Sequence, residues 1–126
     1  MISEKTNNSP KIIINSKKNE IYFEGPSYMD SAHYFYSSIK EEIENYCKNN
    51  NKDLLIVFKF TILNSISYKS IFSILKSINK IYKNRKAIVN WCYEKDDEDS
   101  YEDGKLLEEA FDNIEFSFVE FEDFNI

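Results

Sequence analysis

A run of ten residues from Leu54 to Leu63 places the strongest constraint on how this 126-residue chain can fold. Along this run one alternating set of side chains is entirely apolar, whereas the other set becomes polar at Lys59 and Thr61. The period of two predicts a central β-strand with one face covered more deeply than the other. The apolar set consists of Leu54, Ile56, Phe58, Phe60 and Ile62.

Segments of helical periodicity flank this strand on both sides and alternate with further strand-like runs. Strands that alternate with helices indicate parallel pairing through right-handed crossovers, and therefore one α/β domain with a mixed, mostly parallel sheet and packed helices. Residues 1–10 are polar and aperiodic, so we expect a flexible tail there and a single domain over residues 11–126. The expected order is β-β-α-β-α-β-α-β, with strands at 11–14, 20–23, 54–63, 87–93 and 114–121, and helices at 30–48, capped by Asp30, at 68–84 and around 106–111.

The negative charge of the chain is local. Residues 94–103 hold seven acids and one lysine, which leaves fifteen acids and fifteen bases elsewhere, and together these give the net charge of −6. Since no basic patch stands out, the sequence disfavours binding to nucleic acid. An acidic protein that binds other proteins fits better.

The cysteines and the hydropathy indicate a compartment. Cys47 and Cys92 lie far apart in a chain that opens with polar residues rather than with a secretory signal, which predicts the reducing cytoplasm. The apolar runs are shorter than the roughly 18 residues that a membrane span requires. We therefore expect a cytoplasmic protein without membrane insertion.

The junction between the apolar strand and the following helix contains Ser65 and Ser67. A hydroxyl in the first helical turn lies beside unpaired backbone N–H groups and the positive end of the helix dipole, so a phosphate on it would be favoured electrostatically. Either serine could instead serve only as an N-cap. If the strands ending at Leu63 and Tyr93 are parallel, this junction and the acidic run meet at one edge of the sheet, where α/β proteins usually bind ligands.

Catalysis and metal binding are poorly supported by the residues present. A nucleophilic serine needs a positioned base, and the single histidine, His33, lies in the first turn of the first expected helix. Gly25 and Gly104 are isolated and cannot form a Gly-rich phosphate loop. The acidic run fails as a calcium loop because position twelve, counted from Asp99, is an alanine. We expect no enzyme activity, no cofactor and no metal.

Four segments of the chain resemble the SiaC family of bacterial regulatory phosphoproteins, whose fold is similar to the anti-sigma-factor antagonist (STAS) domain. The likeness extends from about residue 20 to the end of the chain. The segments are Phe23 to Tyr28 before the first helix, Leu63 to Ser67 at the junction, Tyr68 to Ile71, and Val89 to Glu94.

The resemblance implies a partner-switching protein. In this family a dedicated kinase phosphorylates a Thr or Ser at the junction, a PP2C-type phosphatase removes the phosphate, and the unmodified protein activates a diguanylate cyclase in cyclic di-GMP signalling and biofilm formation. The modified residue would be Ser65, with Ser67 as the second candidate. The chain has Ser where relatives often have Thr, and Ile66 where a small polar residue is common.

We expect the partner surface at the junction, at the helix starts and in the acidic run. The alternative is an adaptor that is never phosphorylated and that binds partners through an edge strand, at 11–14 or in the last strand, or through its acidic surface. The residues expected to contact a partner are Tyr28, Asn64, Ser65, Ser67, Tyr68, Asp96 and Asp97.

Overall fold

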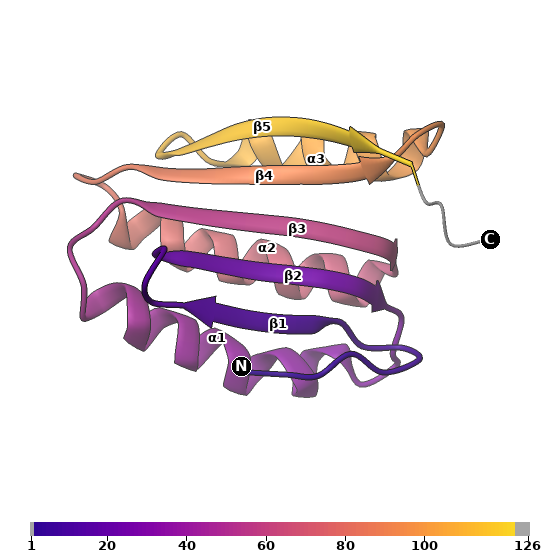
Figure 1. Ribbon diagram of the computed structural model, residues 1–126, viewed down its shortest axis with the longest axis horizontal. Helices are drawn as coiled ribbons and strands as arrows, with labels where there is room; N and C mark the ends of the chain where they lie inside the picture. The colour runs from indigo at the N-terminus through magenta and orange to yellow at the C-terminus, as the bar shows by residue number, and fades with distance from the viewer. Residues whose placement is uncertain (1, 123–126) are drawn as a thin grey trace.

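The computed structural model describes residues 2–122, so the last four residues of the expected domain lie outside it. Five strands form one sheet in the order β1-β2-β3-β4-β5 over this part of the chain (Figure 1). β1 pairs with β2 antiparallel, and the other three pairings are parallel. The strands are β1 (Lys11–Asn15), β2 (Glu20–Ser27), β3 (Leu54–Leu63), β4 (Ala87–Glu94) and β5 (Ile114–Phe121).

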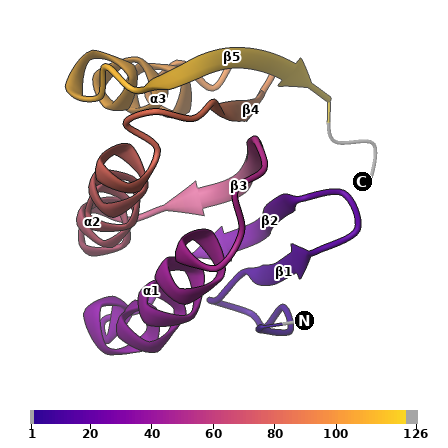
Figure 2. The ribbon, with the colours of Figure 1, turned by 90° about the vertical axis from the view of Figure 1, so that its left-hand side faces the viewer.

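In residues 2–122, three helices cover one face of the sheet (Figure 2). They are α1 (Ala32–Lys48), α2 (Ser65–Ile81) and α3 (Glu98–Ala110), and they alternate with the strands as the sequence predicts. α1 and α2 pack against each other, whereas α3 packs on β4 and β5. The α/β architecture, the element order and the mixed sheet are therefore confirmed.

The buried core lies between the sheet and the helices. The alternating face of β3 predicted to be covered is buried from Leu54 to Phe60, and Phe58 lies in the centre of the core, 5.6 Å between ring centroids from Trp91 of β4. Burial of such large apolar side chains contributes roughly 1.5–3 kcal/mol each, which makes this layer the main source of stability. The core therefore forms where the period of two predicts it.

The prediction for Ile62 is wrong. The pairing of β3 with β2 shifts by one residue at its end, since Phe60 lies opposite Gly25 but Ile62 lies opposite Pro26. The extra residue, Thr61, forms an irregularity that reverses the alternation. Ile62 consequently becomes exposed, and Leu63 turns toward the core.

Residues 2–10, in the segment expected to be a tail, make specific contacts with the domain. Ser3 forms a bridge with Ile12 of β1, and the Ile12 N–H donates to the Ser3 carbonyl at 2.9 Å. The Asn8 carbonyl accepts from the Tyr28 N–H at 2.9 Å. Backbone groups at the free edge of β1 and just after β2 give this segment its partners, although its side chains carry no strand pattern.

The first helix begins later than expected. Ser31, not Asp30, occupies the N-cap position of α1, and its side chain makes no capping hydrogen bond. Among the described residues, no helix is both long enough and apolar enough to cross a bilayer.

Candidate functional site

The junction between β3 and α2 presents Ser65 at the first position of the helix. Asn64 is the N-cap, and its side-chain Oδ1 accepts from the Ser67 N–H at 2.9 Å. The helix therefore starts three residues before the expected Tyr68, and the capping role falls to neither serine. Ser65 is exposed, and its hydroxyl makes no hydrogen bond within residues 2–122. This leaves an oxygen that a modifying enzyme can reach.

Ser67, the second candidate, is fully buried. Its hydroxyl lies 2.7 Å from the Ser27 hydroxyl at the end of β2, and Ser27 in turn lies 2.7 Å from the Tyr36 hydroxyl of α1. A kinase could reach Ser67 only after this buried network opened, and the same burial excludes direct contact with a partner. Ser67 instead joins the junction to β2 and α1.

Asn64 extends this anchoring. Its backbone N–H donates to the Ser27 carbonyl at 3.0 Å, and its side-chain Nδ2 donates to the Met29 carbonyl at 3.3 Å. The first turn of α2 is thus held to the segment that links β2 to α1. Ser65 lies on a fixed support rather than on a loose loop.

Exposed apolar side chains accompany Ser65 at this edge of the sheet. Tyr28 is 59% exposed, Ile62 is 48% exposed and Ile66 is 41% exposed. Ile62 owes its exposure to the irregularity at Thr61, and Ile66 follows Ser65 in the first turn of α2. Apolar exposure around a single polar group is typical of a protein-binding surface.

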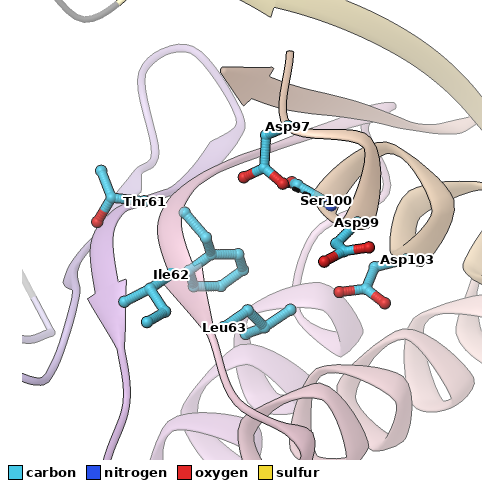
Figure 3. Close-up of a pocket in the computed structure, with 8 residues that line it drawn as sticks. Thr61, Ile62, Leu63, Asp97, Asp99, Ser100 and Asp103 are labelled. Atoms are coloured by element: carbon cyan, nitrogen blue, oxygen red, sulfur yellow. Dashed lines mark hydrogen bonds between the residues drawn. The ribbon is translucent and has the colours of Figure 1, made fainter. Parts of the chain in front are cut away.

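An acidic cleft of about 220 Å³ lies between the end of β3 and the start of α3 (Figure 3). Burial, together with the charges of Asp99 and Asp97, raises the pKa of Asp103 above its ordinary value. The charge of Asp103 in turn contributes, after burial, to the raised pKa of Tyr68 in the first turn of α2. The lining residues are Phe60, Thr61, Ile62, Leu63, Asp97, Asp99, Ser100 and Asp103.

The first turn of α3 fixes these carboxylates. Asp97 caps the helix by accepting from the Ser100 N–H at 3.1 Å, and the Ser100 carbonyl accepts from the Trp91 indole N–H at 2.8 Å. A buried side chain of β4 therefore anchors the acidic turn. Asp96 is exposed beside it, with a positive φ of 70°.

The edge of the sheet brings together most of the residues expected to contact a partner. Tyr28 and Ser65 are exposed, Asn64, Tyr68 and Asp97 are partly buried, and the acidic run reaches the end of β3 through the cleft. Sequence reasoning missed Ile62 and Ile66, and it placed Asp99 and Asp103 in the acidic run without naming them as contact residues. Asp99 and Asp103 are four residues apart, which places them on the same side of a helix, and this spacing could have singled them out.

No hydrogen bond joins His33 to Ser65 within residues 2–122, and the pocket that His33 lines does not include Ser65. That pocket lies between α1 and α2, and His33 takes no part in the acidic cleft. No group of three or more potential metal ligands occurs among the described residues.

A model of the SiaC family of regulatory phosphoproteins matches residues 3–121. The chain belongs to the SiaC family. A search of curated protein sequences finds no match to it. The match covers nearly all of the described residues, including the junction between β3 and α2.

Solved SiaC structures from Pseudomonas aeruginosa share this fold. SiaC in complex with the diguanylate cyclase SiaD, which it activates, has a TM-score of 0.84 and 18% identity, covering 93% of this chain and 96% of that one. Apo-SiaC has a TM-score of 0.81 and 18% identity, covering 91% and 93%. A further SiaC structure has a TM-score of 0.85 and 17% identity, covering 94% and 96%.

Proposed function

We propose that this protein is a non-catalytic, cytoplasmic regulator that exchanges protein partners through reversible phosphorylation of Ser65. The observation that carries the proposal is the exposed Ser65 hydroxyl at the first position of α2, with the capping role already filled by Asn64. A hydroxyl in this place is open to a kinase and is not needed to hold the helix. Membership of a family of regulatory phosphoproteins supports the same function.

The proposed output partner is a diguanylate cyclase, and the proposed modifying enzymes are a cognate kinase and a PP2C-type phosphatase. SiaC of Pseudomonas aeruginosa forms a complex with the cyclase that it activates, which supports the first assignment. The phosphorylation cycle follows from the family resemblance. Control of cyclic di-GMP, and through it of biofilm formation, would be the physiological result.

The folded domain should tolerate the modification. Phosphoserine carries a charge of roughly −1.5 to −2 and three acceptor oxygens. At the N-terminus of a helix the dipole stabilises an anion by about 0.3–1 kcal/mol. Phosphorylation would therefore change the docking surface without unfolding the domain.

Intact mass spectrometry of the protein purified from its native cell tests the proposal. We expect a species heavier by one phosphate, with fragmentation that places it on Ser65, and we expect Ser65→Ala to remove it. A phosphate on another residue would refute the assignment of Ser65. Complete absence of the modified species, under conditions that both raise and lower cyclic di-GMP, would favour the unphosphorylated adaptor.

The acidic cleft should speed the encounter with a basic partner. Asp97, Asp99 and Asp103 present negative charge at the same edge as Ser65, and long-range attraction of this kind weakens as salt screens it. We expect the association rate with the cyclase, measured by stopped flow, to fall at least severalfold between low and physiological ionic strength. Asp99→Asn should make the association rate depend less on salt. A wild-type rate that does not change with salt would contradict electrostatic attraction by the acidic cleft.

A further inference from the structure

A second pocket lies between α1 and α2 and does not involve Ser65. Its volume is about 180 Å³, and its lining residues are His33, Tyr36, Ser37, Lys40, Ser70 and Ser73. The lining contains one lysine, one histidine and three serines but no carboxylate, although the chain has a net charge of −6. The pocket therefore concentrates hydrogen-bond donors on an otherwise acidic protein.

Lys40 directs its ammonium group into this pocket. Its Nζ donates to the Ser73 hydroxyl at 2.9 Å. None of the ion pairs found in residues 2–122 involves Lys40, although Glu44 lies one helical turn further along α1. An ammonium group carries three donors, so two remain for another acceptor.

The serines supply further donors. The Ser73 hydroxyl accepts from Lys40 and donates to no acceptor within the described chain, which leaves its proton available. Ser37 and Ser70 donate to carbonyls of their own helices, at 3.0 Å to Tyr34 and at 3.3 Å to Ile66. Hydroxyl groups rotate freely, so both can turn toward a stronger acceptor.

We propose that this pocket binds a small tetrahedral oxyanion of the phosphate class. A lysine and several hydroxyls that converge without a carboxylate match a ligand that only accepts hydrogen bonds, and charge-assisted bonds to such a ligand are the stronger kind. A pocket of about 180 Å³ has room for phosphate. Pockets that bind drug-sized ligands usually have volumes of roughly 300 Å³ or more. This pocket is smaller, so a whole nucleotide does not fit.

Amide NMR spectra of the full chain, titrated with inorganic phosphate at an ionic strength held constant with sodium chloride, test the proposal. We expect saturable shifts in the amides around Lys40, Ser70 and Ser73. Lys40→Gln should weaken binding at least tenfold, and Ser73→Ala should weaken it about threefold or more. The matched control is Lys69→Gln, which removes the same charge from an exposed site on α2 outside the pocket and should change affinity less than twofold.

Shifts that never saturate, or equal weakening by Lys40→Gln and Lys69→Gln, would overturn the proposal, since either result indicates non-specific attraction. The ligand could be the free phosphate ion or a small phosphorylated metabolite, and a parallel titration with glycerol 3-phosphate distinguishes the two. Tighter binding of glycerol 3-phosphate would support the pocket as a site for small phosphorylated metabolites, and tighter binding of inorganic phosphate would support it as a site for the free ion. Both titrations leave the phosphorylation of Ser65 untouched, so their outcome is independent of the proposed switch.

Discussion

Phosphorylation of Ser65 is expected to lower the affinity of this protein for its proposed cyclase partner at least a hundredfold. The hydroxyl lies among exposed apolar side chains, including Tyr28 and Ile66. A partner that covers this surface must remove water from the phosphate. An unpaired buried charge costs several kcal/mol unless the partner supplies Arg or Lys, and a hundredfold loss corresponds to about 2.7 kcal/mol.

The measurement is a calorimetric titration of the partner with five forms of the protein, one of which is a control. Phosphorylated wild type and Ser65→Asp should both bind weakly. The loss of affinity should be smaller for Ser65→Asp, because aspartate carries less charge than phosphoserine. Ser65→Ala should bind within about twofold of the unmodified protein. Ser16→Asp is the matched control, since it adds the same charge to the exposed turn after β1, at the opposite end of the sheet. Equal affinities for all forms would defeat the desolvation mechanism.

The sequence predicts this fold well because its strands and helices follow simple periods. The apolar alternation in β3 and the helical stripes around it are local signals, and local signals suffice for element order and for the buried face. They fail at Ile62, because the irregularity at Thr61 arises from pairing with β2, which no period within β3 encodes. That failure lies at the candidate site, where it exposes an apolar side chain.

The two junction serines could not be distinguished from sequence. Both occupy the first turn of α2, but only Ser67 faces inward to Ser27 and Tyr36. Those partners come from β2 and α1, about thirty to forty residues earlier in the chain, so the distinction depends on tertiary packing. The proximity of the acidic run to the junction was predictable, because it follows from the parallel order of β3 and β4 alone.

Replacement of Gly104 by alanine is expected to destabilise the protein by about 1–3 kcal/mol, which is the usual cost of overpacking a core. Gly104 lies within α3, where a Cβ would come 2.5 Å from Cδ1 of Trp91 and 2.7 Å from Cε2 of Phe118. Trp91 is 1% exposed and its indole N–H is held by the Ser100 carbonyl, so the ring has little room to move. The helix must shift away instead.

The sign of this effect separates packing from helix propensity. Alanine is better than glycine in a helix by about 1 kcal/mol, so propensity alone predicts that Gly104→Ala stabilises the protein. Urea unfolding followed by circular dichroism measures the difference, and Glu109→Ala at an exposed position of the same helix should change stability by less than about 0.5 kcal/mol. A gain in stability for Gly104→Ala would contradict the contact with Trp91. Because the first turns of α3 also carry Asp99 and Asp103, a displaced helix should open the acidic cleft and weaken the salt-dependent attraction of the partner as well.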